Sequence, residues 1–255
     1  MPPADEPVRV WGLPLAPVTF DRALDRIDQL IAAGRPSLVI TANLNYAMLV
    51  DADPRLRTVT DRAGLVLADG MPLVWWSKLG PRPLPERVAG SDLIYSLCER
   101  AARRGYGVYL LGAGPGIADE AAAKLVAKYP GLRIVGVECP PFRKLSADED
   151  REQIARIRTA RPDILVVAFG QPKGEFWIDE RLDRLGVPVC VQVGATLDFV
   201  AGRMKRSPKW MQKTGVEWVY RMLQEPRRLA KRYLNNILFL LRAVFASRFR
   251  RERRR

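Results

Sequence analysis

The sequence predicts an α/β protein with a doubly wound, mainly parallel β-sheet and a basic, amphipathic helical segment at its C-terminus. Short apolar runs rich in β-branched residues alternate with longer helical patterns along residues 1–202, which is the order that βαβ units produce. The runs are apolar almost throughout, as in parallel strands that are covered by helices on both faces. From residue 203 onward the pattern changes to basic helical sequence.

Six runs are predicted to form the strands of this Rossmann-like sheet, and several of the helices between them have recognisable starts. Ser91, before an Asp-Leu-Ile-Tyr stretch, indicates the start of one helix. Ser146 with Glu149 three residues later is the pattern of a capping box. The predicted strands cover residues 37–41, 64–69, 106–112, 133–138, 163–170 and 187–194.

The C-terminal segment predicts one helix over residues 207–224 and, after Pro226, a second over 227–249. At about 100° per residue, the second helix has an apolar side and a polar, mostly basic side. The apolar side carries Leu229, Tyr233, Ile237, Leu240, Leu241, Val244 and Phe245. The polar side carries Arg228, Lys231, Arg232, Asn235 and Arg242, while Phe239 and Arg248 fit neither side.

Charge divides the chain at the same place. Residues 1–202 hold 25 basic and 25 acidic side chains, whereas residues 203–255 hold 17 basic and 3 acidic ones and so carry the whole net charge of +14. We therefore predict an α/β catalytic domain over 1–202 and a basic helical appendage over 203–255. Such asymmetry indicates an anionic partner, either nucleic acid or a membrane surface. A basic amphipathic helix suits the lipid interface, and the alternative is packing on its own domain or on another subunit.

Composition excludes several classes of chemistry. The chain has no histidine, which removes Ser-His-Asp and Cys-His catalysis and His-ligated zinc. Proton transfer must then use a carboxylate, Lys, Tyr or Cys. The three cysteines, Cys98, Cys139 and Cys190, form no CxxC pair, so we expect a reducing cytosol and no disulfide framework. We also expect no signal peptide and no spanning helix, because no long uncharged apolar stretch is present.

Polar residues follow four of the predicted strands. Ligands of open α/β sheets bind outside the carboxyl ends of the strands, so we expect these residues to meet at one edge. They are Thr41, Asn43 and Asn45 after the first strand, Asp69 and Gly70 after the second, Gly112, Gly114 and Gly116 after the third, and Gln171, Lys173 and Glu175 after the fifth.

Asp69 is the candidate general base. It ends an apolar strand, where partial loss of hydration raises the pKa of a carboxyl towards neutrality. Gly70 then lets the backbone turn closely around a ligand. Asp69 before Gly-Met-Pro also has the pattern of a helix N-cap, and the residues alone leave both interpretations open.

The Gly112-Ala-Gly-Pro-Gly116 turn follows a strand and opens a helix, so its amides are placed to hold nucleotide phosphates. The dinucleotide pattern is incomplete, because Ile117 stands where glycine or alanine is expected. Glu138 ends the next strand and is suited to bind a ribose. An NAD(P)-dependent oxidoreductase therefore remains an alternative, and so does a plain glycine-rich turn.

Two acidic clusters are weaker candidates. Asp51 and Asp53 match a D-x-D metal pattern, but they lie in a helical stretch before a proline and not at a strand end. Carboxylate pairs of this kind are common on solvated helices, and we predict no metal site. The acidic run from Asp148 to Asp150 is explained by the favourable charge of a first helical turn.

With these features located, the chain resembles the WecG/TagA/CpsF family of bacterial glycosyltransferases. The matching segments occur in the family's order and extend over residues from about 8 to 235. They are TANLNYAMLV (41–50), LADGMPLVWW (67–76), RVAGSDL (87–93), LLGAGPG (110–116), FGQPKGEFWI (169–178), VGATLDFVAG (193–202) and GVEWVYRMLQEPRRLAKRYL (215–234).

The resemblance implies an inverting, metal-independent transfer of a sugar from a UDP-sugar to a polyprenyl-diphosphate-linked saccharide, with no cofactor. Asp69 matches the family's base, which deprotonates the acceptor hydroxyl. Residues Thr41, Asn43 and Arg87 match substrate contacts, and Gly112 and Gly114 lie in a turn near the nucleotide. Arg221 and Arg228 lie in the appendage, which in the family closes the site and meets the acceptor diphosphate at the membrane; the guanidinium fork suits phosphate.

One position departs from the family pattern. The usual P-K-Q-E is Pro172-Lys173-Gly174-Glu175 here, so a glutamine expected to contact substrate is absent. Gln171 is placed to supply an amide from the same loop, beside Lys173, and the sugar preference is expected to differ if it does not.

The expected partners are the two substrates, an anionic membrane surface on the cytoplasmic face of the cell membrane, and in some states a second copy of the chain. Binding of nucleic acid by the arginine-rich tail is the remaining alternative. The tail aromatics lie mostly along the apolar stripe and do not form an interleaved stacking platform. We therefore predict no nucleic-acid partner.

Overall fold

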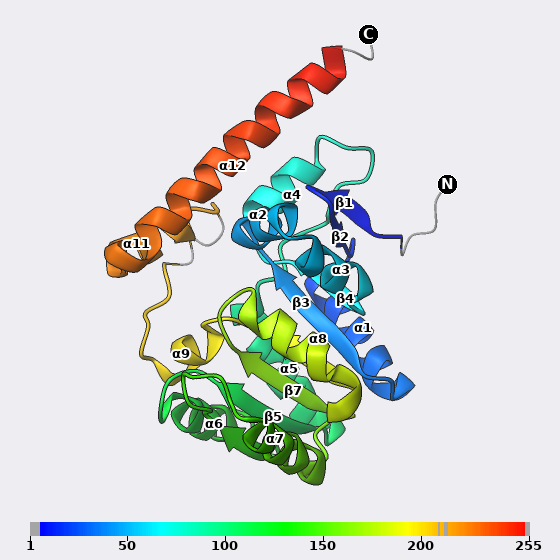
Figure 1. Ribbon diagram of the computed structural model, residues 1–255, viewed down its shortest axis with the longest axis vertical. Coiled ribbons are helices and arrows are strands. Elements are labelled where there is room, and N and C mark those ends of the chain that lie inside the picture. The colour runs from blue at the N-terminus through cyan, green and yellow to red at the C-terminus, as the bar shows by residue number, and fades with distance from the viewer. Residues whose placement is uncertain (1–5, 209, 212–213, 253–255) are drawn as a thin grey trace.

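A computed structural model describes residues 6–208, 210–211 and 214–252. Its centre is a six-stranded sheet in which every neighbouring pair is parallel, in the order β4-β3-β8-β7-β5-β6 (Figure 1). The strands are β3 (Ser37–Ala42), β4 (Leu65–Ala68), β5 (Gly107–Gly112), β6 (Arg133–Glu138), β7 (Ile164–Ala168) and β8 (Val189–Gln192). All six predicted strands are confirmed, and so is the Rossmann-like doubly wound fold.

Helices cover both faces of the sheet, and each face has its own hydrophobic core. On one face pack α1 (Phe20–Ala33), α5 (Gly90–Arg104), α6 (Ile117–Lys128) and α9 (Thr196–Ala201). On the other pack α2 (Leu44–Ala52), α3 (Pro54–Arg62), α4 (Met71–Ser77), α7 (Ala147–Ala160) and α8 (Lys173–Leu185). Val166 points into the first core and Val167 into the second. Both sides of each strand are therefore buried, which explains the uninterrupted apolar runs.

The chain reverses its direction across the sheet between β5 and β7. After β5 it continues to β6 at the edge, whereas after β7 it continues to β8 on the opposite side. Ligands of doubly wound folds bind at such a switch point, outside the carboxyl ends of the strands. The loops that follow these two strands contain the Gly112–Gly116 turn and Gln171. The topology therefore places both at the expected ligand-binding edge of the sheet.

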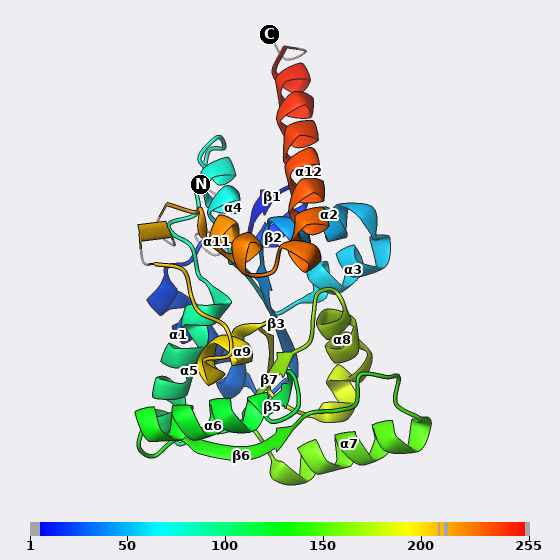
Figure 2. The same ribbon diagram turned by 90° about the vertical axis from the view of Figure 1, so that its left-hand side faces the viewer.

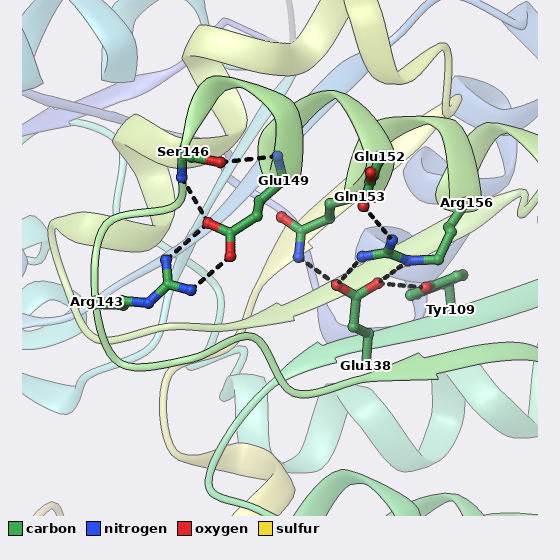
Figure 3. Close-up of polar contacts among 8 residues, drawn as sticks. All are labelled: Tyr109, Glu138, Arg143, Ser146, Glu149, Glu152, Gln153 and Arg156. Carbon is green, nitrogen blue, oxygen red and sulfur yellow. Dashed lines mark hydrogen bonds and ion pairs between the residues drawn. The ribbon is translucent and has the colours of Figure 1, made fainter.

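One predicted helix start is confirmed and the other is wrong. The hydroxyl of Ser146 accepts from the Glu149 amide at 3.2 Å, while the Glu149 carboxylate accepts from the Ser146 amide at 2.7 Å (Figure 3). This is the predicted capping box at the start of α7. Helix α5 instead begins at Gly90, ahead of Ser91, because the Val88 amide donates to Ala68 and holds the chain against β4 until it enters the helix.

A small antiparallel hairpin precedes the sheet and was not predicted. Its strands, β1 (Val8–Val10) and β2 (Leu13–Leu15), have three residues each, which is too short for an alternating pattern to show. The turn places Trp11 and Gly12 at φ values of 49° and 83°. The hairpin packs in the same core as α4.

The first C-terminal helix is shorter than predicted. Residues 207–224 do not form one helix, because Gly215 has a φ of 71° and interrupts it. Of the described residues, Trp210 and Met211 are helical before this break, and α11 (Glu217–Gln224) and α12 (Pro226–Glu252) follow it. The second helix is thus confirmed, with Pro226 at its first position, where a missing amide proton costs nothing. None of the described helices has the length and apolar character needed to cross a membrane.

Helix α12 packs on the body at its beginning and extends away from it further on (Figures 1 and 2). Leu229 is buried, and the ring of Phe239 lies 5.7 Å from that of Trp11 in the hairpin. The packing alternative is therefore realised for part of the helix, and Phe239 belongs to that contact. A stripe of apolar side chains remains exposed: Leu234, Ile237, Leu238, Leu241, Val244 and Phe245.

Candidate active site

Asp69 lies directly after β4, at the carboxyl edge of the sheet. Its amide donates to the carbonyl of Ala42 at 2.7 Å, which ties the residue to the end of β3. The N-cap of α4 is Gly70, and no side chain caps this helix. The N-cap interpretation of Asp69 is therefore wrong, and its carboxylate is left for other contacts.

The surroundings of Asp69 bring its pKa close to neutrality. Burial is the largest influence and raises the pKa of this carboxyl to about 7. Arg87 lowers the pKa, Glu217 raises it, and a hydrogen bond from the Gly90 backbone and the charge of Arg221 lower it again. A carboxyl with this pKa is half ionised near physiological pH, which suits a general base.

Arg87 connects the body of the protein to the C-terminal segment. Its guanidinium lies 3.2 Å from the Glu217 carboxylate in α11 and 3.8 Å from that of Asp92 in α5. The side chains of Arg87 and Glu217 are only 16% and 18% exposed. Arg206 forms a further ion pair with Asp92. Residues distant in the sequence therefore form one charged network next to Asp69.

Arg221 comes from the next turn of α11. Its guanidinium lies over the ring of Phe199, 5.4 Å from the ring centroid, and its charge acts on Asp69. The structure thus brings Arg221 to the candidate site. The side chain of Arg228 lies outside the part of the chain that is described, and its predicted role stays a prediction.

A series of polar contacts crosses the carboxyl ends of the central strands. The Thr41 hydroxyl donates to the carbonyl of Gln192 at 3.1 Å, and the Gln171 amide donates to the carbonyl of Thr41 at 3.4 Å. The amide of Asn45 reaches the Gln171 carbonyl oxygen, also at 3.4 Å. Asn43 caps α2 through the Tyr46 amide at 3.1 Å. Thr41, Asn43 and Gln171 therefore lie together, as the strand-end pattern predicts.

The Gly112–Gly116 turn has a backbone that only small residues allow. Gly112 has a φ of 106°, and a Cβ there would lie 2.8 Å from the Phe169 ring and 2.9 Å from the Ala168 carbonyl oxygen. Gly116 is the N-cap of α6 and has no side chain to satisfy the amides of the first turn. The Ile117 amide donates to the Gly114 carbonyl at 3.0 Å, so the amides of the next two residues are the ones that suit an anion. Ile117 packs against Gly114, which explains the break in the dinucleotide pattern.

The departure at Gly174 has a structural reason. A Cβ at this position would lie 2.8 Å from Cγ of Gln192, so glycine makes room for that glutamine. The Gln192 side chain donates to the Phe169 carbonyl at 2.6 Å. Lys173 is exposed at the first position of α8, and Glu175 is fully buried.

Three residues of this region were missed as site residues in the sequence: Glu217, Asp92 and Gln192. Gln192 is a fully buried glutamine inside an otherwise apolar strand, which was a usable signal. Glu217 is one of only three acidic residues in the basic segment 203–255. An acid that persists in so basic a stretch points to a specific partner, which the structure identifies as Arg87.

Glu138 is occupied by protein contacts (Figure 3). Its carboxylate accepts from Tyr109 at 3.1 Å, from Gln153 at 2.6 Å and from two nitrogens of Arg156 at 3.0 and 3.3 Å. A carboxylate offers about four acceptor positions, and these contacts fill them. Despite its partial burial, hydrogen bonds from Arg156 and Gln153 lower the pKa of Glu138. Glu138 therefore anchors α7 to β6, which removes the support for a dinucleotide site.

The D-x-D pair has structural contacts of its own. Asp53 caps α3 through the amides of Arg55 at 2.8 Å and Leu56 at 3.3 Å. Asp51 lies 3.7 Å from Arg57. Within the described residues, no group of three or more acidic or cysteine side chains is arranged to hold a metal ion.

Comparison with known proteins adds to this geometry. Residues 8–254 match the model of the glycosyl transferase WecG/TagA/CpsF family. A protein of Bacillus spizizenii, N-acetylglucosaminyldiphosphoundecaprenol N-acetyl-beta-D-mannosaminyltransferase, is 31% identical over 192 residues, which are 75% of this chain and 73% of that protein.

Proposed function

This chain belongs to the glycosyl transferase WecG/TagA/CpsF family and is a glycosyltransferase, and from that premise we propose that it transfers a sugar from a UDP-sugar to a polyprenyl-diphosphate-linked saccharide. The observation that carries the proposal is the position of Asp69: a carboxyl with a pKa of about 7 at the carboxyl edge of the sheet, between arginines of the body and of α11. The relative from Bacillus spizizenii acts on an undecaprenyl-diphosphate-linked sugar, which supports the acceptor class.

Asp69 carries the proton transfer in this mechanism. The carboxylate accepts the proton of the acceptor hydroxyl while that oxygen attacks the anomeric carbon of the donor sugar. The bond between the anomeric carbon and the diphosphate breaks, UDP leaves, and the configuration at the anomeric carbon inverts. General-base catalysis of this kind contributes a factor of about 10²–10⁴ to the rate.

The arginines of the site are positive and are suited to neutralise the negative charge of the substrate diphosphates. Arg87 and Arg221 lie beside Asp69, and a guanidinium binds phosphate oxygens bidentately. We assign them, with Arg228, to the diphosphates of donor and acceptor, where they stabilise the charge that develops on the leaving UDP. This supplies the stabilisation that other transferases take from a divalent metal.

The remaining site residues are assigned to the donor. We assign the amides at the start of α6, after the turn with Gly112 and Gly114, to the nucleotide phosphates. Thr41, Asn43 and Gln171 form the polar series at the strand ends and are suited to sugar hydroxyls, and Lys173 adds a cation at the start of α8. Because Gly174 replaces the family glutamine, Gln171 is the amide that we assign to the sugar.

The C-terminal segment brings the enzyme to its lipid-linked acceptor. The exposed apolar stripe of α12 and the basic residues of segment 203–255 suit a helix that lies in the interface of an anionic membrane. We propose a peripheral position on the cytoplasmic face of the cell membrane. The same stripe is able to pair with a second copy of the chain away from lipid.

The test is a reconstituted reaction. Purified protein is mixed with N-acetylglucosaminyl-diphospho-lipid and with UDP-N-acetylmannosamine, UDP-N-acetylglucosamine, UDP-glucose or UDP-glucuronate in the presence of EDTA. We expect UDP release and a lengthened lipid-linked saccharide with one of these donors, with inverted anomeric configuration. Release of UDP only after a divalent metal is added contradicts the metal-independent mechanism, and no product with any donor contradicts the proposed substrates.

A further inference from the structure

The ion pair between Glu217 and Arg87 joins two distant segments of the chain and is largely buried. It joins the first turn of α11 to the loop before α5, 130 positions away in the sequence, at 3.2 Å. Both side chains are mostly buried. Exposed ion pairs contribute little, but separating one that is largely removed from water leaves an uncompensated charge. The contact therefore matters for how α11 sits on the body.

The pair also lies at the catalytic carboxyl. Glu217 and Arg87 both act on Asp69, with opposite sign, and Asp92 approaches the same guanidinium at 3.8 Å. Arg87 is thus surrounded by three carboxylates. A guanidinium so placed is already engaged by protein anions in the region where we propose that a substrate diphosphate binds.

Carboxylates and phosphates use a guanidinium in the same way, through paired N–H donors. The Glu217 carboxylate therefore has the chemistry of the ligand that Arg87 is assigned to bind. We propose that Glu217 is a further active-site residue, a positioning residue. It binds the Arg87 guanidinium where a substrate phosphate binds, and it is displaced from Arg87 when the diphosphate arrives. This rests on the proposed function, which supplies the diphosphate.

The helix carrying Glu217 also carries a proposed ligand of the diphosphate. Arg221 follows Glu217 by four residues, which places both side chains on the same face of α11. Breaking the Glu217 contact and engaging Arg221 are thus events on one helix face. Substrate binding exchanges one anionic partner of Arg87 for another, so the helix stays over the site while its contacts change.

The experiment measures binding of anions to the full-length protein and to Glu217→Gln, which keeps the shape of the side chain and removes its charge. The probes are UDP and inorganic pyrophosphate in calorimetry, and the KM for the lipid-diphosphate-linked acceptor. We expect at least one of them to improve by about three- to tenfold. The matched control is Glu225→Gln, the same change at the C-cap of α11, which should leave all three within twofold.

The probes separate the two sources of diphosphate. Tighter UDP binding places Arg87 at the donor, and a lower KM for the acceptor alone places it at the acceptor; either result supports the proposal.

A second readout is the pH profile of kcat/KM. Removing the Glu217 charge removes an influence that raises the pKa of Asp69, so the acid limb should move to lower pH in Glu217→Gln and stay in place in Glu225→Gln.

Glu217→Asp and thermal unfolding guard against a variant that is merely damaged. The aspartate keeps the charge, so its anion affinity should stay nearer the wild type than that of Glu217→Gln. If the wild type binds UDP, pyrophosphate or the acceptor, and Glu217→Gln improves none of the three, this inference alone is overturned. If the wild type binds neither anion nor the acceptor, the proposed function fails and the inference fails with it.

Discussion

The pKa values of three buried or half-buried carboxyls are shifted differently because their hydrogen-bonding and charged partners differ. Glu138 has its acceptor positions filled by Tyr109, Gln153 and Arg156, and its pKa is lowered. Asp69 is balanced between burial and nearby arginines. Glu175 is fully buried, and both of its oxygens lack a hydrogen-bond partner among the described residues. Burial therefore raises the pKa of Glu175 to about 7.

Glu175 predicts a pH dependence of stability. Its folded-state pKa of about 7 lies above the ordinary value of 4.5, so the folded state keeps a proton that the unfolded chain releases between these values. The free energy of unfolding should therefore fall as pH rises from about 4.5 to 7. At ~1.4 kcal/mol per pKa unit, the fall amounts to about 3 kcal/mol.

Glu175→Gln should remove that part of the slope. Urea denaturation of the wild type and the variant at pH 5.5 and pH 8 measures it, and the difference between the two proteins isolates Glu175 from Asp69, which contributes with the same sign. Glu152→Gln, at an exposed position of α7, is the control and should keep the wild-type slope. An unchanged slope in Glu175→Gln would show that Glu175 ionises normally in the folded protein.

The sequence predicts that Asp69 and its neighbours lie together, because polar residues at the ends of parallel strands lie at one edge of the sheet. It does not predict Glu217 as the partner of Arg87, because no local pattern relates positions 130 residues apart. It also left Asp69 undecided between base and helix cap. The position of Gly70 at the N-cap excludes the cap, and the role of Asp69 as a base stays a proposal.

At the scale of elements, the turn after β5 should tolerate substitution poorly. Gly112→Ala combines a φ of 106° with contacts of 2.8 Å to Phe169 and 2.9 Å to the Ala168 carbonyl. Because a backbone oxygen cannot move aside, we expect a loss of about 3 kcal/mol in urea denaturation, from overpacking of typically about 1–3 kcal/mol together with strain of roughly 1–2 kcal/mol at the positive φ. Gly34→Ala, with φ 66° and nothing within 4 Å, should lose only about 1 kcal/mol from strain. Equal losses would contradict the close packing at Gly112.

Helix α12 makes the second prediction at this scale. The triple variant Ile237→Ser, Leu241→Ser and Phe245→Ser removes exposed apolar side chains and should leave the body folded. Burying one such side chain in lipid contributes roughly 1.5–3 kcal/mol, so binding to vesicles that contain anionic lipid should weaken at least tenfold in sedimentation assays.

The control changes exposed apolar residues of the body, Val126→Ser and Phe142→Ser, and should bind vesicles as the wild type does. Binding that survives in the triple variant would place the membrane contact elsewhere. The helix itself was predictable from the basic, amphipathic pattern. Which apolar residues contact the body was not, because Phe239 finds Trp11 through a hairpin too short to predict.

At the scale of the molecule, a neutral α/β body and a cationic C-terminal segment share one site. Asp69 and Arg87 come from residues 1–202, whereas Glu217 and Arg221 come from segment 203–255. The two parts differ in charge along the sequence, and in the structure α11 contacts the body through the ion pair between Glu217 and Arg87. The basic segment that carries the net charge of +14 thus includes Arg221, whose charge acts on Asp69, and we propose that its other basic residues face a membrane.

The most direct test of this account is the pH dependence of kcat/KM for the wild type and for Asp69→Asn in the reconstituted reaction. For the wild type, kcat/KM should rise as pH increases through about 7, where the Asp69 carboxyl loses its proton. In Asp69→Asn, kcat should fall by about 10²–10⁴ and the rise should disappear, while UDP still binds and the thermal unfolding temperature is no lower than that of the wild type. An Asp69→Asn enzyme that keeps the wild-type rate, or the same rise through pH 7, would contradict the account.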